Sequence, residues 1–231
     1  YKRQRVYKLI SEGDRIAVCV SGGKDSMLLA KLVQELERHG SRNFTAEYIC
    51  MDPGYNAENL ERIKYNAGLL GIPLNIFRSD VFEAAEMVNA DSPCYMGARM
   101  RRGCLYARAK ELGCNKIALG HHRSDVIETT LMGMFYGGQV QGMMPRIKSS
   151  YFEGMELIRP MYCILEEDIE HWRDYNGLHF IACACSFTQR LADSGQARSV
   201  RAEMKELVKE MKRRNPDVEK SLFRSIHNVQ L

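Results

Sequence analysis

An apolar run passes directly into a glycine-rich loop at Val18-Cys19-Val20-Ser21-Gly22-Gly23-Lys24-Asp25-Ser26-Met27, and a helical pattern begins immediately after the loop. Adjacent glycines allow the backbone to turn tightly and to point its amides at an anion, and the following helix adds its positive end. Serine hydroxyls and a lysine supply further donors and a charge. The sequence therefore predicts a phosphate-binding loop made of Ser21, Gly22, Gly23, Lys24, Asp25 and Ser26.

The spacing of this loop differs from that of better-known phosphate loops. A Walker A loop separates its first glycine from a Gly-Lys-Ser/Thr by four residues, and a dinucleotide-binding fingerprint needs a third glycine at helical spacing. Neither pattern is present, and an ordinary glycine-rich turn is the remaining alternative. Ser-Gly-Gly-x-Asp-Ser after a strand resembles the pyrophosphate loop of the N-type ATP pyrophosphatases. That resemblance implies cleavage of ATP between its α and β phosphates and adenylation of a substrate oxygen.

Composition restricts the class of protein. The 231 residues are enough for one domain, or one domain with a short appendage, and 45% hydrophobic residues suffice for a buried core. No apolar run approaches the length of a membrane-spanning helix. Eight cysteines are too sparse for a disulfide scaffold in a chain of this length. We therefore expect a cytoplasmic protein without a membrane partner, whose thiols serve metal or sulfur chemistry.

The net charge of +4 is small, but its distribution is uneven. Residues 198–224 contain nine Lys or Arg against five Asp or Glu, which equals the whole excess. A second basic cluster consists of Arg99, Arg101 and Arg102. Basic helices usually present a solvated face, but clusters of this kind also bind nucleic acid. The three arginines are our candidate RNA-binding residues, and the basic tail is a second candidate.

Strand and helix signals alternate along the first two-thirds of the chain, which is typical of a parallel α/β sheet covered on both faces. We therefore predict a doubly wound sheet, with residues 1–197 as one domain and residues 198–231 as a basic helical extension packed on it. Beyond Gly138 the pattern weakens. The predicted strands are 15–20, 45–51, 74–77, 116–119 and 180–182; the predicted helices are 26–39, 57–70, 98–112, 125–136, 166–175 and one that includes 200–211; residues 143–151 are predicted as loop and 157–160 as a short apolar segment.

A second polar motif follows the fourth predicted strand at Gly120-His121-His122-Arg123-Ser124-Asp125. Ligands of open parallel sheets bind beyond the carboxyl ends of the strands. Gly120 allows close backbone approach there, and Asp125 can either cap the next helix or ligate Mg²⁺. We predict that ATP binds between this motif and the phosphate loop, with its base near Met51.

At this point the chain resembles a specific family, the tRNA 2-thiocytidine synthetases. The resemblance runs from about Gly13 to Cys185 and includes four motifs in order: Arg101-Arg102-Gly103, Leu119-Gly120-His121-His122 with Asp125, Met134-Phe135-Tyr136-Gly137-Gly138, and Ile158-Arg159-Pro160. It implies that ATP adenylates the C2 oxygen of an anticodon-loop cytidine, and that a sulfur nucleophile then displaces AMP to give 2-thiocytidine. The candidate catalytic residues are Lys24, Asp25 and Cys94.

The same resemblance implies a [4Fe-4S] cluster on three cysteines, two of them in a Cys-x-x-Cys. Here Pro93-Cys94-Tyr95-Met96-Gly97 has glycine where the second cysteine is expected. Glycine has no side chain that could ligate iron. Cys94, Cys183 and Cys185 could supply three thiolates, although two ligands one residue apart bind one cluster awkwardly. Both an intact cluster and a labile or absent one therefore remain open.

Two other functions stay open on the sequence alone. A lysidine synthetase uses the same loop with an amine nucleophile, and an ATP-binding module without catalysis is favoured by Gly97. The expected partners are tRNA and a sulfur donor such as a cysteine desulfurase, and the sequence does not decide whether the protein is a homodimer.

Overall fold

The structure, a computed structural model, describes residues 7–78, 93–181 and 200–228, with the backbone alone over residues 93–99. At its centre is a six-stranded sheet with the strand order β3-β2-β1-β4-β6-β5. Neighbouring strands are parallel except β5, which runs antiparallel to β6 at one edge. The predicted doubly wound sheet is confirmed. The strands are β1 (Arg15–Cys19), β2 (Thr45–Asp52), β3 (Leu74–Arg78), β4 (Lys116–Ala118), β5 (Arg146–Lys148) and β6 (Glu156–Ile158).

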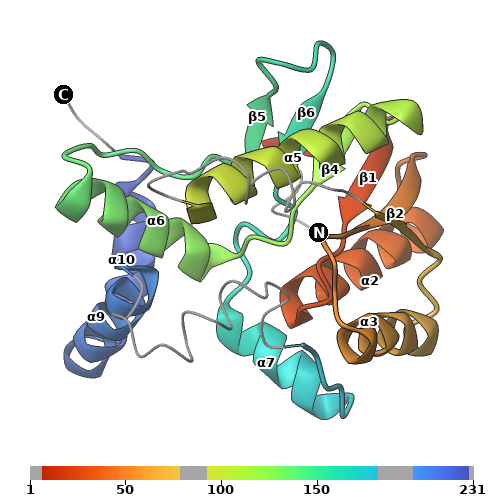
Figure 1. The fold of residues 1–231 in the computed structure, drawn as a ribbon. Coiled ribbons are helices and arrows are strands. Elements are labelled where there is room, and N and C mark those ends of the chain that lie inside the picture. Colours follow the sequence, from red (N-terminus) through yellow and green to blue (C-terminus); the bar gives the residue numbers. More distant parts are fainter. Residues whose placement is uncertain (1–6, 79–92, 182–199, 229–231) are drawn as a thin grey trace.

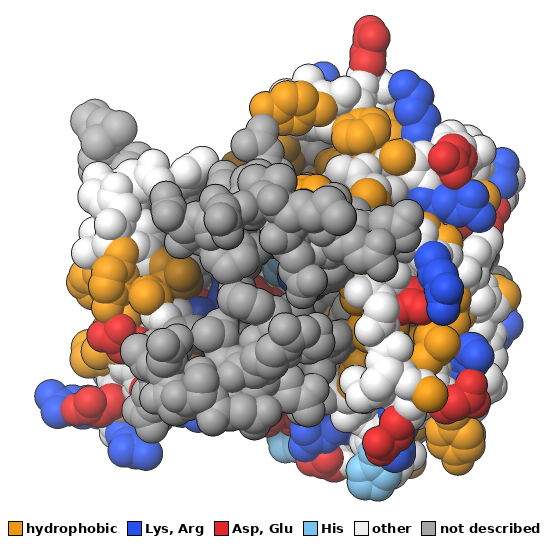
Figure 2. Space-filling model, in the orientation of Figure 1, with side chains coloured by type: hydrophobic (Ala, Val, Ile, Leu, Met, Phe, Trp, Pro, Cys, Tyr) orange, Lys and Arg blue, Asp and Glu red, His pale blue; other side chains and the backbone are white. Residues whose placement is uncertain are grey.

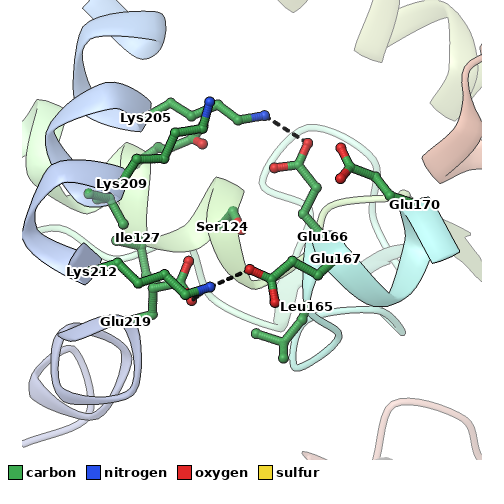
Figure 3. A pocket seen from close by; sticks show the side chains of 12 residues that line it. Ser124, Ile127, Leu165, Glu166, Glu167, Glu170, Lys205, Lys209, Lys212 and Glu219 are labelled. Atoms are coloured by element: carbon green, nitrogen blue, oxygen red, sulfur yellow. Dashed lines mark hydrogen bonds and ion pairs between the residues drawn. The ribbon is translucent and has the colours of Figure 1, made fainter. Parts of the chain in front are cut away.

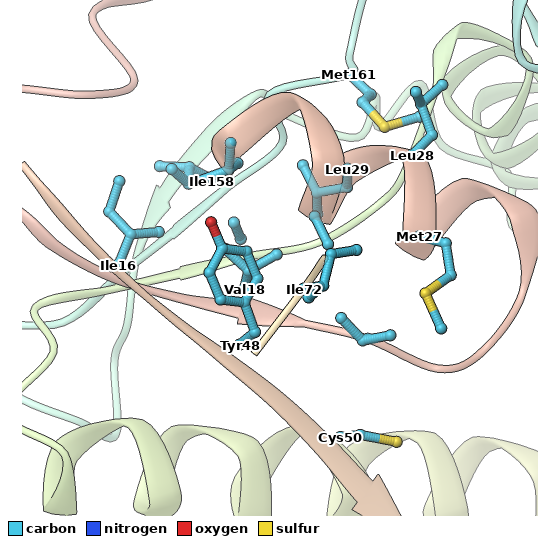
Figure 4. Packing of buried hydrophobic residues seen from close by; sticks show 14 of the residues in the cluster. Ile16, Val18, Met27, Leu28, Leu29, Tyr48, Cys50, Ile72, Ile158 and Met161 are labelled. Atoms are coloured by element: carbon cyan, nitrogen blue, oxygen red, sulfur yellow. The ribbon is translucent and has the colours of Figure 1, made fainter. Parts of the chain in front are cut away.

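Helices cover both faces of the sheet (Figure 1). Successive strand residues point to opposite faces, so each strand contributes to two apolar layers. Val18 and Cys50 belong to the layer shared with α2 and α3, part of which Figure 4 shows. Ala17 and Ile49 belong to the opposite layer, which contains side chains of α5. The helices are α2 (Lys24–His39), α3 (Ala57–Leu69), α5 (Pro93–Glu111), α6 (Arg123–Tyr136), α7 (Glu166–Tyr175), α9 (Val200–Arg214) and α10 (Val218–Ser225).

The strand order reverses between β1 and β4. From β1 the chain proceeds outward through β2 to β3, and α5 then leads back to β4 on the other side of β1. The loops after β1 and β4 therefore leave the sheet side by side at its carboxyl edge. Ligands of doubly wound proteins bind at this kind of switch point.

The C-terminal helices pack on α6, at the left of Figure 1. Ile127 and Leu131 of α6 form a small buried cluster with Met204 and Val208 of α9. The apolar spacing in the basic tail thus marks a docked helix, while the domain boundary at residue 197 stays a prediction. No helix in the described part of the chain is both long enough and apolar enough to cross a membrane.

Two predictions beyond Gly138 were wrong. The predicted loop 143–151 contains β5, whose three residues are all exposed and therefore carry no apolar signal. Phe180 and Ile181 of the predicted last strand lie outside any strand, and Ala182 lies outside the described residues. The strand beside β4 is β6, which overlaps the start of the apolar segment 157–160. Both strands have only three residues, and no glycine follows them to mark a strand end as Gly120 does after β4.

Helix α5 begins five residues earlier than predicted. We expected a helix from residue 98, whereas the helix starts at Pro93 and includes Cys94 in its first turn. Proline favours the first helical position because its missing N–H has no helical partner there. Positions 94 and 97 therefore lie one turn apart in the same helix.

Candidate active site

The two predicted loops lie against each other at the switch point. Val18 and Ala118 are register partners on β1 and β4, so both loops leave the same edge of the sheet. A Cβ placed on Gly120 would lie 3.1 Å from the backbone of Asp25 and Ser26. A side chain at this position would require the backbone of α2 to move by a few tenths of an ångström, so glycine favours the close approach of the two loops. The site is therefore assembled from segments about one hundred residues apart.

The glycine-rich loop has a compact backbone conformation. Gly22 has a φ of +85°, and a Cβ there would lie 2.5 Å from the side chain of Ile63. The Ser26 hydroxyl accepts a hydrogen bond from the Ser21 amide at 3.1 Å and donates one to the Gly23 carbonyl at 3.0 Å. Gly23 is the N-cap of α2 and has no side chain to accept from the helix. The amides of the first turn are thus available to an anion.

Lys24 stands at the start of α2 between two carboxylates. Its Nζ lies 3.1 Å from Oδ1 of Asp25 and 3.3 Å from Oε1 of Glu166 at the start of α7. Partial burial opposes the charge of the lysine, but Asp25 and Glu166 outweigh it and raise its pKa above the ordinary value. The ammonium group therefore stays charged, and negatively charged phosphates can compete with the carboxylates for it.

His122 links the two loops. Its Nε2 lies 3.7 Å from Oδ1 of Asp25 and 3.5 Å from Oδ2 of Asp125, so two carboxylates flank one buried ring nitrogen. The backbone amide of His122 donates to Oδ2 of Asp125 at 3.0 Å, which caps α6. Asp125 therefore caps α6, which is one of the two roles that the sequence suggested for it. Its other oxygen, Oδ1, faces away from the cap.

That other oxygen of Asp125 is bound by a residue of the C-terminal tail. Nη1 of Arg201 donates to Oδ1 of Asp125 at 2.9 Å and lies 3.3 Å from Oε2 of Glu128. Burial raises the pKa of Glu128 to about 7, although Arg201 acts in the opposite direction. Lys205, one turn further on α9, lies 2.8 Å from Oε1 of Glu166. Burial alone would raise the pKa of Glu166, but the hydrogen bond and charge of Lys205 lower it.

A cavity of about 610 Å³ opens beside the loop and is lined by Gly23, Lys24, Asp25 and part of the segment 173–181. Its volume lies within the usual range for small-ligand sites. Met51 is buried at the end of β2, beside β1. The position of the ATP base near Met51 stays a prediction.

A group of positive charges lies on the other side of Gly120. Burial and the charge of Arg159 lower the pKa of His121 to about 4, and burial and the charge of Arg102 lower the pKa of Arg159 to about 10. Arg102 of α5 is exposed, and Arg101 is half-buried. On the described part of the face in Figure 2, positive and negative side chains are mixed.

The described residues provide magnesium ligands only in part. Among them, no three His, Cys, Asp or Glu side chains lie close enough together to hold a metal by themselves. Mg²⁺ commonly takes one or two carboxylates and completes its shell with phosphate oxygens and water. Asp125 and Asp25, on either side of His122, fit that pattern when ATP supplies the remaining ligands.

Three of the five described cysteines are buried thiols that do not suit an iron-sulfur cluster, and no three metal-ligating side chains among the described residues lie together. Burial raises the pKa of Cys19 and Cys50 to about 12 and that of Cys114 to about 11, which disfavours the thiolates that iron needs. All three lie in the two apolar layers. The predicted ligands Cys183 and Cys185 lie outside the described residues. So do the side chains of Cys94 and Arg99.

Sequence reasoning missed most of the charged partners in this site. Glu166 was only the first residue of a predicted helix, and its contact with Lys24 spans 142 residues. Arg201 and Lys205 were part of a basic tail considered for RNA, and the structure pairs both with carboxylates of the site. No local pattern marks a contact of this range. The amphipathic spacing of the tail was the one signal that it docks.

Comparison with known proteins identifies the family. Residues 1–191 match the PP-loop domain family. The tRNA-cytidine(32) 2-sulfurtransferase of Geobacter metallireducens is 34% identical over 97% of this chain and 85% of its own length, and that of Geotalea uraniireducens is 36% identical over 97% and 87%. The chain therefore belongs to the PP-loop proteins and, within them, to the tRNA-cytidine(32) 2-sulfurtransferase family.

A solved structure shares the fold. The U34-tRNA thiolase NcsA of Methanococcus maripaludis, determined with its [4Fe-4S] cluster, aligns with a TM-score of 0.72 over 96% of this chain and 73% of its own, at 21% identity. At that level of identity the similarity concerns the fold alone. It agrees with the switch-point architecture of the sheet.

Proposed function

We propose that this protein is an ATP-dependent tRNA sulfurtransferase that converts an anticodon-loop cytidine, at position 32 by analogy with its relatives, into 2-thiocytidine. The observation that carries the proposal is the contact between Gly120 and the first turn of α2, which joins the two motifs into one site. The uncharged cytidine C2 oxygen is a poor leaving group, and adenylation makes it a good one. The site supplies what adenylation requires, namely an anion cradle, a charged lysine and carboxylates for a metal.

The first step is adenylation. The C2 oxygen of the cytidine forms a bond to the α phosphorus of ATP, and the bond from that phosphorus to the bridging oxygen breaks as pyrophosphate leaves. Negative charge builds on the leaving pyrophosphate. The amides after Gly23 and the ammonium of Lys24 lie where they would stabilise that charge.

Magnesium is the metal that we expect in this step, since it neutralises charge on the departing phosphates. Asp125 would be its main protein ligand and Asp25 a second. His122, between these two carboxylates, holds their relative position through its ring and its backbone amide.

The second step exchanges oxygen for sulfur. A hydrosulfide nucleophile forms a bond to C2, AMP leaves with the former C2 oxygen, and loss of the S–H proton leaves a thiocarbonyl. Where the donor delivers a persulfide, its outer sulfur forms the bond to C2, and a second thiol then breaks the S–S bond and leaves as a disulfide. We infer that the sulfur comes from a donor such as a cysteine desulfurase and that Cys94 takes part in its transfer. A [4Fe-4S] cluster on Cys94, Cys183 and Cys185 would supply sulfur binding at iron, and Gly97 leaves that cluster one expected thiolate short.

The tRNA is expected to approach from the side of α5. Arg101 and Arg102 precede the buried part of the helix, and Arg102 acts electrostatically on the loop after β4. With these arginines on the phosphates, a flipped cytidine could reach the crevice. The proposal places the reaction in the cytoplasm, where tRNA and ATP are present, and leaves residues 1–197 as the catalytic domain. A homodimer remains a further expectation.

The proposal is tested by two linked measurements. ATP labelled in its β and γ phosphates should release labelled pyrophosphate, and bulk tRNA should increase the rate. Release without any tRNA dependence would support a nucleotide-binding module with residual hydrolysis. Mass analysis of nucleosides after incubation with a sulfur donor should show cytidine heavier by the difference between sulfur and oxygen. A lysine adduct in its place would identify the lysidine-type ligase.

A further inference from the structure

The basic helix α9 reaches the candidate active site with two side chains one turn apart. Nη1 of Arg201 lies 2.9 Å from Asp125 Oδ1, and its Nη2 donates to the hydroxyl of Thr129 at 3.1 Å. Lys205 lies 2.8 Å from Glu166. Positions 201 and 205 lie on one face of the helix. The tail thus presents two cations to the two sides of the site.

The second contact extends to the phosphate loop. Oε1 of Glu166 lies between Nζ of Lys205 and Nζ of Lys24, at 2.8 and 3.3 Å. Figure 3 shows Lys205 of α9 pointing across a pocket toward Glu166 of α7. The pocket has a volume of about 240 Å³ and separates the two helices. Helix α9 is therefore connected to the loop lysine through one shared carboxylate.

The first contact compensates buried negative charge. The side chain of Glu128 is 7% exposed and that of Asp125 is 22% exposed, and both carboxylates face the guanidinium of Arg201. A buried charge without a partner is strongly unfavourable, so these groups need a cation. Because Oδ2 of Asp125 caps α6, Oδ1 is the oxygen left for a cation. Arg201 and a metal ion would use the same atom.

We propose that Arg201 is a positioning residue, which holds the Asp125 carboxylate while the site is empty of metal and yields it to Mg²⁺ when Mg-ATP binds. This inference rests on the proposed function, since it takes Asp125 as a magnesium ligand. Yielding Asp125 removes the shortest of the three contacts of Arg201 and leaves those with Glu128 and Thr129. The first turn of α9 therefore loosens when the site is loaded, while Lys205 keeps its contact with Glu166.

The test compares the affinity for ATP with excess Mg²⁺ and with EDTA, by equilibrium dialysis. The dissociation constant with EDTA divided by that with Mg²⁺ measures how strongly the metal helps ATP to bind. Removing a competing cation in Arg201→Ala should increase that ratio by about 3- to 10-fold, the range of one partly exposed charged contact. Arg201→Lys keeps a charge and should fall between that variant and the wild type. Arg213→Ala, at an exposed position further along α9, is the matched control and should equal the wild type.

Hydrogen exchange of residues 200–207 provides a readout independent of activity. In the wild type, Mg-ATP should speed exchange in this segment, and ATP with EDTA should not. In Arg201→Ala, hydrogen exchange of residues 200–207 should already be fast without ligand, and Mg-ATP should not change it. If Arg201→Ala does not fold, as judged by circular dichroism, Arg201→Lys carries the same comparison with the same expected direction.

The outcomes separate this inference from the proposed function. A ratio in Arg201→Ala equal to or below that of the wild type, with Mg-ATP bound by both, overturns the competition and leaves the proposed function standing. The proposed competition is also overturned if Mg-ATP does not change hydrogen exchange of residues 200–207 in the wild type. A wild-type protein that binds no ATP, with or without Mg²⁺, overturns both.

Discussion

At the scale of single residues, Lys24 carries the clearest prediction. Lys24→Ala should lower the rate of pyrophosphate release about 10²- to 10³-fold, because it removes a preorganised cation from the leaving phosphates. The free energy of unfolding should change by only about 1 kcal/mol, since the ion pairs of Lys24 are partly exposed to solvent. Labelled pyrophosphate release and urea unfolding measure the two effects. Lys64→Ala, at an exposed lysine of α3 that pairs with Glu61, is the control. Unchanged release in Lys24→Ala would refute the assignment.

Gly120 tests whether the two loops must touch. In Gly120→Ala the new methyl group would lie 3.1 Å from backbone atoms of Asp25 and Ser26, and backbone cannot rotate away as a side chain can. We expect a loss of about 1–3 kcal/mol in the free energy of unfolding, as for other overpacked sites. ATP affinity should fall as well, because the loops are pushed apart. Gly68→Ala in α3 is the control, since a methyl group there meets no atom within 4 Å among the described residues. Equal effects of both changes would contradict the contact.

At the scale of elements, the ion pair between Asp14 and Lys116 attaches the start of β4 to the N-terminal segment. Nζ of Lys116 lies 2.5 Å from Oδ2 of Asp14, and both side chains are buried. Burial opposes the charge on Asp14, but hydrogen bonds from Lys116, Asn115 and the Ser11 amide outweigh it and lower its pKa below 3.8. A carboxyl whose pKa is lowered on folding stabilises the protein above its unfolded pKa and loses that effect as the pH falls through the folded pKa.

Asp14→Asn should therefore cost about 3 kcal/mol at pH 7, because it leaves Lys116 buried with its best partner removed. The difference from the wild type should begin to shrink as the pH falls below about 4, the pKa of an unfolded Asp, and should vanish as the pH falls through the lower pKa of the folded carboxyl. Urea unfolding at a series of pH values measures this. Glu61→Gln, in an exposed pair, should change the free energy of unfolding by less than about 0.5 kcal/mol throughout. A difference that stays constant down to the lowest pH would contradict the sign of the pKa shift.

Helix α5 carries the prediction about sulfur. Positions 94 and 97 lie one turn apart in it, so Gly97→Cys would place a second thiol at the spacing that the family uses. We expect iron and acid-labile sulfide to increase after anaerobic reconstitution, and thiolation with them, while ATP affinity stays unchanged. Gly103→Cys puts a thiol in the same helix but off that face, and it should gain no iron. Failure of Gly97→Cys to gain iron would argue against a cluster at Cys94.

At the scale of the whole molecule, the prediction concerns tRNA. Each phosphate contact adds roughly 0.7 to 0.9 to the slope of log affinity against log salt concentration. Replacing Arg101 and Arg102 with alanine should therefore flatten the slope and weaken binding without changing preference among sequences. The control replaces Arg62 and Lys64 with alanine. These residues are on α3, which covers the opposite face of the sheet, and their replacement should leave the slope unchanged. Binding that does not respond to salt would refute the arginine surface.

The local sequence by itself determined the phosphate loop, the first four strands and their helices. Those elements have runs of five or more apolar or amphipathic residues, or glycines at turns, and such signals depend only on near neighbours along the chain. It also indicated the family, because the motifs around Gly22, Arg101 and Gly120 occur in order. It failed at β5 and β6, which are as short as β4 but have no glycine directly after them to mark the end of a strand.

Only the tertiary structure decided which charges meet. Lys24 contacts Glu166, and Asp125 contacts Arg201, across 142 and 76 residues of sequence. Those pairs form because the strand order reverses beside β1 and because the apolar side of α9 docks on α6. Hydrophobic burial fixes where the helices lie, and the charged side chains on their edges then take the partners that this placement offers. A local pattern records the apolar face of a helix, but not the carboxylate that its other face will reach.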